Sequence, residues 1–239
     1  MKKKIFAEAF KYSIPVLLGY LAIGAAFGLM LVDSGYPWYL GLFMSIVMYA
    51  GSGQYAAVGI FASGAGLWEA CLIQLVLNAR HVAYGITLLK RFNKAKKYKP
   101  YLIFALTDET FALLSSINDD DKRFGENDNE RHKFLFYVSA LDHFYWIAGS
   151  MLGAVAGLLI PFNFDGVNFA LTALFIVLMI EQIKRVKKAY PFIIAAVTAV
   201  ISVLVLSPRV SLLCALAVSL LVVQLFSKPT SVQKEPHHA

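Results

Sequence analysis

The sequence predicts an all-α polytopic membrane protein. Hydrophobic residues make up 59% of the 239 residues and charged residues only 15%, whereas soluble domains are about half apolar and about a quarter charged. The mean hydropathy is +0.63. Several apolar stretches approach the roughly 20 residues that a helix needs to cross hydrocarbon. None of them alternates apolar and polar residues as the strands of a membrane β-barrel do.

Seven stretches are long and apolar enough to be membrane helices, and an eighth is shorter and more polar. The seven lie at 13–32, 38–62, 66–89, 134–160, 166–183, 189–206 and 210–227, and the eighth lies at 100–117. We therefore expect one membrane domain over residues 1–227, with seven to eight hydrophobic segments. The tail 228–239 is polar and contains two prolines, so we expect it to be disordered.

The charged loops predict an orientation and reveal a conflict. The lysines at 2–4 favour a cytoplasmic N-terminus, and the cationic runs 90–99 and 184–188 also favour the cytoplasm. Three complete spans before residue 90 would place 90–99 on the opposite side of the membrane from the N-terminus. Either one segment between 38 and 117 is broken or re-entrant, or the positive-inside rule fails here. The net charge of +7 is explained by these loops, so we expect no nucleic-acid partner.

Three polar motifs interrupt the apolar segments of this same region. They are AGSGQ at 50–54, NARH at 78–81 and TDET at 107–110. Irregular backbone at membrane depth is tolerated only where protein or a water-filled cavity satisfies its hydrogen bonds. Broken membrane helices commonly hold transporter substrates. We therefore expect three broken, polar segments that form one intramembrane site.

The first motif has two explanations of equal weight. Gly51 and Gly53 weaken a helix, while Ser52 and Gln54 can bond freed backbone groups or a ligand. Alternatively, the glycines allow a tight helix crossing, and Gln54 bonds a neighbouring helix.

The second motif carries a permanent positive charge. Helical spacing places Asn78 and His81 on one side of the helix and Arg80 and Tyr84 on another. An arginine at the centre of a membrane helix costs about 2.5–3.5 kcal/mol on insertion scales, so it needs a compensating partner. Snorkelling to a helix end is the alternative. His81 titrates near physiological pH unless it is perturbed, which leaves coupling to protons open.

The third motif supplies negative charge. Asp108 and Glu109 are adjacent, and neighbouring helical residues point about 100° apart, so we expect the two carboxylates to serve different partners. One of them can pair with Arg80. The other can bind an amine, exchange a proton or snorkel.

Glycines recur at helical spacing in two distant segments. Gly24 and Gly28 precede a turn at Pro37, and a glycine series from Gly149 to Gly157 precedes a turn at Pro161. Small residues four apart allow close helix packing in any membrane bundle, and we favour this interpretation over a true structural repeat.

Four motifs in order resemble the large subunit of the AzlC/BrnF-type branched-chain amino-acid exporters: PVLLGYLAIGAAFGL, YAGSGQY, NARHVAYG and LTDETFA. The resemblance covers about residues 10 to 226. It implies a multi-pass permease of the bacterial inner membrane that exports leucine, isoleucine, valine and sometimes methionine. It also implies a small hydrophobic AzlD/BrnE-type membrane subunit as partner, with no cofactor and no metal ion.

The motifs that match the family give the expected substrate-binding or coupling residues. These are Tyr49, Gly51, Ser52, Gly53, Gln54, Asn78, Arg80, His81, Tyr84, Thr107, Asp108, Glu109 and Phe111. Phe27, Gly28, Gly85 and Trp146 also match. Asp142 and His143 stand where the family has uncharged residues, and their role is left open between specificity, proton handling and packing.

Two other classes of function compete with a transporter. An enzyme would need a nucleophile or metal constellation, and the sequence contains no HExxH, no GxSxG and no P-loop. A channel or other small-solute permease is the stronger alternative, because polar breaks also line pores.

Overall fold

The computed structural model describes residues 2–159, except 65, 119, 120 and 126, together with 189–206 and single positions between 176 and 222. The chain divides into two units, residues 1–175 and 176–239, and each is described by itself. The expected segments 166–183 and 210–227, the run 184–188 and the tail 228–239 lie wholly or largely outside the described residues. The single membrane domain therefore stays a prediction.

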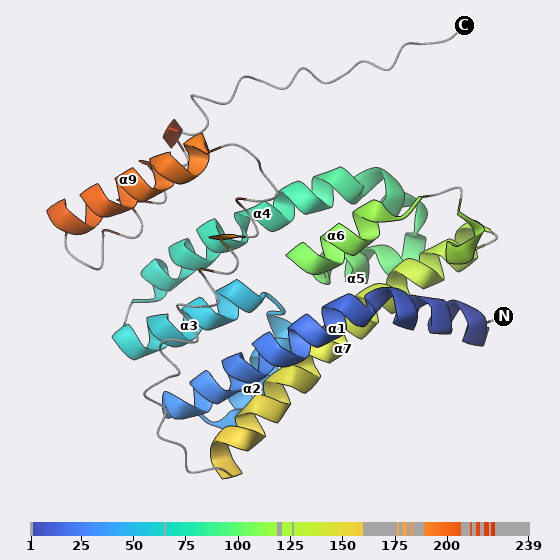
Figure 1. The fold of residues 1–239 in the computed structure, drawn as a ribbon, viewed down its shortest axis with the longest axis horizontal. Coiled ribbons are helices and arrows are strands. Elements are labelled where there is room, and N and C mark those ends of the chain that lie inside the picture. Colours follow the sequence, from blue (N-terminus) through green and yellow to red (C-terminus); the bar gives the residue numbers. More distant parts are fainter. Residues whose placement is uncertain are drawn as a thin grey trace, which may run out of the picture. The chain divides into compact units, whose positions relative to one another are not determined.

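Three long helices frame the first unit (Figure 1): α1 (Lys2–Asp33), α4 (Leu67–Lys94) and α7 (Asp128–Leu159). The described residues contain helices and no strand, as the sequence predicts. By length and composition, Lys4–Asp33 and Leu67–Lys94 are long and apolar enough to cross a membrane.

The three long helices run in alternating directions. α1 and α7 lie side by side and point the same way, because Phe6 packs on Tyr137 near their starts and Gly28 meets Ala154 near their ends. α4 points the opposite way. Phe92, at its end, is buried in one cluster with residues from the starts of α1 and α7.

Glycines bring the backbones of α1 and α7 into contact. A Cβ atom on Gly24 would lie 3.0 Å from the backbone nitrogen of Ser150, and one on Gly28 or Gly153 would overlap backbone atoms of the facing helix. The contacts are reciprocal, since Gly28 faces Ser150 and Gly153 faces Ala25. This confirms the close packing predicted from the glycine spacing. The reciprocity is also compatible with the repeat alternative.

The apolar segment 38–62 is a helical hairpin that turns back beside the middle of α1. It consists of α2 (Trp38–Val47) and α3 (Gly51–Ser63). At its tip, Tyr49 has φ +39°, an uncommon conformation for a non-glycine residue, and its ring lies 6.5 Å from that of Tyr20. At its base, Phe61 packs on Tyr36, with ring centroids 5.6 Å apart. The hairpin therefore begins and ends at one end of the unit.

The segment 100–117 is a second hairpin, and it enters from the opposite end. After the 3-10 turn η1 (Lys96–Tyr98), it consists of α5 (Lys99–Phe104) and α6 (Asp108–Ser116). Tyr98 packs on Phe136 near the start of α7, with ring centroids 5.1 Å apart. The α6 end returns to the start of α1, where the hydroxyls of Ser116 and Tyr12 are 2.8 Å apart. A further 3-10 turn, η2 (Lys122–Phe124), precedes α7.

The hairpins remove the conflict between charge and span count. Because α2–α3 turns back, the loop 90–99 lies at the same end of the unit as the N-terminus. The expectation of broken segments is correct at 50–54 and 107–110. It is wrong at 78–81, which lies inside the continuous helix α4.

In the second unit, the described helix is α9 (Tyr190–Val205). It agrees with the expected segment 189–206. Its apolar side chains are largely exposed within the described residues, Val203 and Leu204 among them.

Candidate functional site

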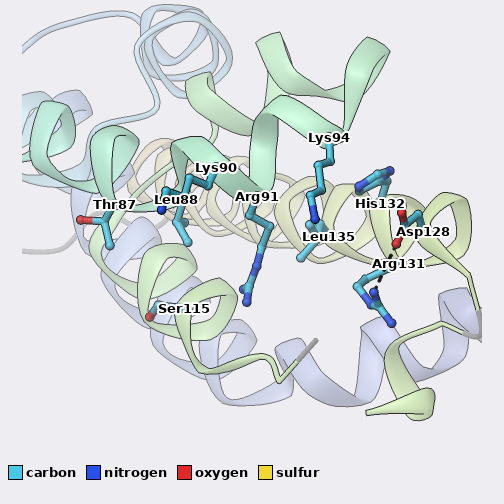
Figure 2. Close-up of a pocket in the computed structure, with 10 residues that line it drawn as sticks. All are labelled: Thr87, Leu88, Lys90, Arg91, Lys94, Ser115, Asp128, Arg131, His132 and Leu135. Carbon is cyan, nitrogen blue, oxygen red and sulfur yellow. Dashed lines mark hydrogen bonds and ion pairs between the residues drawn. The ribbon is translucent and has the colours of Figure 1, made fainter. Parts of the chain in front are cut away.

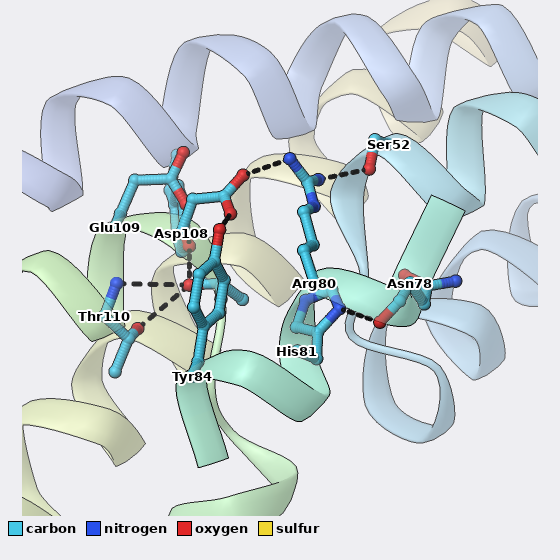
Figure 3. Close-up of polar contacts among 10 residues, drawn as sticks. Ser52, Asn78, Arg80, His81, Tyr84, Asp108, Glu109 and Thr110 are labelled. Atoms are coloured by element: carbon cyan, nitrogen blue, oxygen red, sulfur yellow. Dashed lines mark hydrogen bonds and ion pairs between the residues drawn. The ribbon is translucent and has the colours of Figure 1, made fainter. Parts of the chain in front are cut away.

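Arg80 joins the tips of the two hairpins (Figure 3). Its guanidinium donates from Nη2 to the hydroxyl of Ser52, at 2.7 Å, and its Nη1 lies 2.7 Å from Oδ2 of Asp108. Ser52 lies in the first turn of α3, and Asp108 is the first residue of α6. The side chains of Arg80 and Asp108 are 36% and 19% exposed, so this ion pair is partly accessible. The predicted pairing of Arg80 with a carboxylate of the third motif is therefore present.

Tyr84 binds the same carboxylate from one turn further along α4. Its hydroxyl donates to Oδ1 of Asp108, and its ring stacks on Phe111, with centroids 4.4 Å apart. The spacing that puts Arg80 and Tyr84 on one side of the helix thus lets both reach Asp108. Asp108 also lies at the positive end of α6, where a carboxylate is stabilised.

Glu109 has a different partner, as expected for adjacent carboxylates. Its Oε2 accepts a hydrogen bond of 2.8 Å from the hydroxyl of Tyr20, on α1. The same hydroxyl lies 2.5 Å from Oγ1 of Thr107. Thr107 is the N-cap of α6, and its Oγ1 accepts from the backbone N–H of Thr110.

The N-terminus of α3 is packed against α4 but has no side-chain cap. The backbone carbonyl of Gly53 accepts a 2.8 Å hydrogen bond from Gln74, whose Oε1 in turn accepts from Asn78. A Cβ atom on Gly53 would lie 2.7 Å from Gln74 Oε1, so a larger residue would displace the Gln74 side chain. The N-cap residue, Ala50, offers no side-chain acceptor. The first N–H groups of α3 therefore receive no acceptor from the side chain of the N-cap residue.

Gln54 does not belong to this group. Its side chain is fully buried, accepts from Trp146 Nε1 at 2.8 Å and donates to Ser45 at 3.2 Å. A Cβ atom on Gly51 would lie 3.1 Å from the Trp146 ring. The contacts of Gln54 and Gly51 are those of the tight helix crossing, whereas Ser52 of the same motif bonds Arg80.

A small cavity opens beside the hairpin tips. Its volume is about 190 Å³, and it is lined mainly by apolar side chains with a few polar ones: Met48, Tyr49, Ala50, Asn78, His81, Ile103, Phe104 and Leu106. His81 and Ile103 also line a neighbouring hollow of about 390 Å³ on the α4 surface. Binding sites for drug-sized molecules occupy about 300–1,000 Å³, so the smaller cavity is on the scale of a single small side chain. Phe27, by contrast, is fully buried and stacks on Trp146.

The AzlC protein family model matches residues 15–160, which is more than half of the chain. The chain belongs to the AzlC family. A membrane protein of Helicobacter pylori (strain 26695) is 39% identical over 94% of this AzlC-family chain and 96% of its own length. The Bacillus subtilis branched-chain amino acid transport protein AzlC is 36% identical over 77% of the chain and 70% of its own length. The Escherichia coli inner membrane protein YgaZ is 29% identical over 75% of the chain and 74% of its own length. No solved structure matches the chain significantly.

The AzlC motifs did not identify all the polar residues around the hairpin tips. Tyr20 and Thr110 lie within the quoted motifs but were not among the expected site residues, because a single hydroxyl gives no indication of its partner. Gln74 was missed although a glutamine within an apolar run is itself a signal. Asp142 is fully buried and accepts from the hydroxyl of Thr110 at 2.8 Å. His143 donates from Nε2 to the carbonyl of Ser45 and stacks on Tyr49, with centroids 4.2 Å apart.

A larger cavity with a charged lining lies away from the predicted site (Figure 2). It has a volume of about 510 Å³ and lies where the end of α4 meets α6 and the start of α7. Its charged and titratable lining is mostly basic: Lys90, Arg91, Lys94, Arg131 and His132, with Asp128. Arg91 donates to the carbonyls of Leu114 and Ile117, which closes the C-terminal end of α6. None of the expected site residues lines this cavity.

Proposed function

We propose that the chain is the large subunit of a secondary active transporter that exports branched-chain amino acids. It works in the bacterial cytoplasmic membrane as a multi-pass protein with its N-terminus in the cytoplasm, and it has no catalytic role. Membership of the AzlC family and the similarity to the Bacillus subtilis branched-chain amino acid transport protein AzlC support the substrate class.

The observation that carries this proposal is the position of Arg80 between Ser52 and Asp108. A free amino acid has a carboxylate, an ammonium group and a side chain, and a binding site must meet all three. Arg80 can grip the carboxylate through two parallel hydrogen bonds. The open N-terminus of α3 lies beside Ser52 and favours the same anion.

The other two groups of the substrate also have partners close by. When the substrate carboxylate takes over Arg80, Asp108 is released to face the ammonium group. The cavity of about 190 Å³ beside Tyr49 and Asn78 then receives a small apolar side chain. With the substrate absent, Arg80 and Asp108 neutralise each other, which lowers the cost of keeping the arginine in an apolar environment.

A small hydrophobic AzlD/BrnE-type subunit and the lipid bilayer are the proposed neighbours of α4. Within the first unit, this helix exposes large apolar side chains along its length, including Leu67 (80%), Leu75 (69%) and Val82 (65%). Such a surface is unfavourable in water and needs lipid or a protein partner.

A channel or another small-solute permease is the competing function, because two broken helices that meet at their tips also occur in pores. Flux against a substrate gradient separates the two classes. A transporter moves the amino acid uphill when a proton motive force is present, whereas a channel only equilibrates it.

The test is reconstitution of the chain with its small subunit into liposomes, followed by counterflow with a panel of amino acids. Leucine, isoleucine and valine are expected to exchange, while lysine and glutamate are not, because the cavity that receives the side chain is lined mainly by apolar groups. Equal flux of lysine or glutamate would contradict the proposed substrate class. Liposomes without the small subunit test the proposed partner.

A further inference from the structure

Asp142 is a buried carboxylate outside the Arg80 site. It lies on α7, is 0% exposed and accepts a hydrogen bond from Thr110. Within the described part of the chain, its Oδ1 has no hydrogen-bond partner and no cation forms an ion pair with it. Burying an unpaired charge is costly. The adjacent His143 is directed elsewhere, toward Ser45 and Tyr101.

Three hydroxyl groups connect Asp142 to Glu109. Thr110 Oγ1 lies 2.8 Å from Asp142 Oδ2, and Thr107 Oγ1 lies 3.1 Å from Thr110 Oγ1. Tyr20 OH lies 2.5 Å from Thr107 Oγ1 and 2.8 Å from Glu109 Oε2. The chain of contacts runs from α7 through α6 to α1 and back to α6.

Counting protons shows what this series of hydrogen bonds requires. Three hydroxyls supply three protons, but the two carboxyl groups and the hydroxyls between them make four contacts. If both carboxylates were ionised, each would accept from its neighbouring hydroxyl, and one oxygen–oxygen contact in the chain would lack a proton. One additional proton, carried by either Glu109 or Asp142, completes all four hydrogen bonds in a single direction.

The surrounding groups do not remove this requirement. Next to Glu109, Arg80 is committed to Asp108 at 2.7 Å. The titratable groups that face Asp142 are the phenols of Tyr20 on α1, Tyr49 at the tip of α2–α3, Tyr101 on α5 and Tyr145 on α7, and the neighbouring His143 ring bonds Ser45 and Tyr101 instead. Among the described residues, no group of three or more His, Cys, Asp and Glu side chains could hold a metal ion. The four oxygen–oxygen distances from Asp142 to Glu109 are hydrogen-bond distances.

We propose that Glu109 and Asp142, linked through Tyr20, Thr107 and Thr110, form a site that binds one proton and couples amino-acid transport to proton movement. In the transfer step, the Glu109 O–H bond breaks and an O–H bond forms on Asp142. Each of the three hydroxyls gives one proton and receives one, so only the two carboxyl groups change. Glu109 is adjacent to Asp108, so release of Asp108 by the substrate changes the charge beside the proton site. The proposal rests on the proposed transport function.

The experiment uses the chain with its small subunit in proteoliposomes, with leucine as substrate and an entrapped pH-sensitive dye. An imposed pH gradient is expected to drive leucine accumulation together with proton flux. Asp142→Asn should lose gradient-driven accumulation and leucine-dependent proton flux far more than it loses leucine exchange at equal pH. Asp128→Asn, an exposed carboxylate at the start of the same helix, is the matched control and should behave like the wild type.

A second pair of variants covers the case in which Asp142→Asn does not assemble. Thr110→Val interrupts the hydroxyl chain and leaves both carboxylates in place, and it should show the same loss of coupling. Thr110→Ser keeps the hydroxyl and should restore coupling. Normal proton flux in Asp142→Asn or Thr110→Val would overturn the proton site, as would accumulation driven by a sodium gradient alone. Failure of the wild type to exchange leucine would instead overturn the proposed function.

Discussion

Arg80 is the residue on which the proposed binding site depends. One planar guanidinium reaches Ser52 and Asp108, which belong to hairpins that enter from opposite ends of the unit. A lysine ammonium is a point charge on a flexible stem and cannot reproduce this fork. The arrangement therefore depends on the shape of the cation as well as on its charge.

Replacing Arg80 by lysine should impair transport even when the protein assembles normally. Loss of a hydrogen bond to a charged group costs about 1.5–3 kcal/mol, which corresponds to a fall of about tenfold or more in binding. Initial rates of leucine export measure the effect, and assembly with the small subunit is checked in each variant. Arg123→Lys is the control, because Arg123 is exposed and pairs with Asp121 outside the site. If Arg80→Lys and Arg80→Gln both export at the normal rate, Arg80 only snorkels and the site is misplaced.

The sequence predicts that Arg80 pairs with a carboxylate of the third motif, but it does not identify which residue Gln54 bonds. Arg80 and Tyr84 are one helical turn apart, and an intramembrane cation needs a carboxylate, so local spacing and charge are enough to indicate the pair Asp108 and Glu109 as candidates. Gln54 bonds Trp146, which is 92 positions away. Nothing in local sequence specifies such a pair, since it depends on how α3 packs against α7.

At the scale of elements, the two hairpins differ from the continuous helix α4 in how their polar groups are satisfied. In α4, Nδ2 of Asn78 bonds the carbonyl of Gln74, and the His81 ring bonds the carbonyl of Asn78. These bonds stay within the helix, so NARH needs no break. Tyr49, in contrast, adopts a positive φ at the tip of α2–α3. The glycines that follow indicate weak helix there, but no residue pattern predicts a left-handed tyrosine.

The α1–α7 contact gives a prediction about assembly. Gly28→Ala adds a methyl group where a Cβ atom would overlap the backbone of Ser150, and overpacking of this kind costs about 1–3 kcal/mol. We expect a lower midpoint of thermal unfolding in detergent. Gly19→Ala is the matched control on the same helix, because a Cβ atom there has no neighbour within 4 Å. Equal midpoints for the two variants would mean that α1 and α7 do not touch at these glycines.

At the scale of the first unit, each hairpin follows a long helix and turns back toward the end at which that helix finished. α2–α3 follows α1, and α5–α6 follows α4, which runs in the opposite direction. The two tips therefore meet near the middle of the unit, where discontinuous helices of transporters place their substrate sites. The basic residues of α4 are at its C-terminal end, whereas Leu67 begins the helix at the opposite end of the unit. Charge left open whether a segment turns back or the positive-inside rule fails, and it could not indicate that two segments turn back.

This topology predicts which positions share a side of the membrane. Because α2–α3 turns back, Ser34 before it and Gly66 after it should both face the outside. Lys97 should face the cytoplasm, and so should Lys187 in the run 184–188, which lies outside the described residues. Single cysteines at these four positions, in a chain whose Cys71 and Cys214 have been replaced by serine, can be labelled from each side of sealed vesicles with a membrane-impermeant maleimide.

A cysteine can be introduced at the described labelling positions without a steric conflict. Ser34, Gly66 and Lys97 are exposed, and a Cβ atom on Gly66 has no neighbour within 4 Å. If 38–62 were a complete span, Ser34 and Gly66 would be labelled from opposite sides. Because α4 would still cross, Lys97 would then share a side with Ser34 and be labelled from outside. Only a hairpin that turns back puts Ser34 and Gly66 together on one side and leaves the cationic loop on the other, where the positive-inside rule requires it.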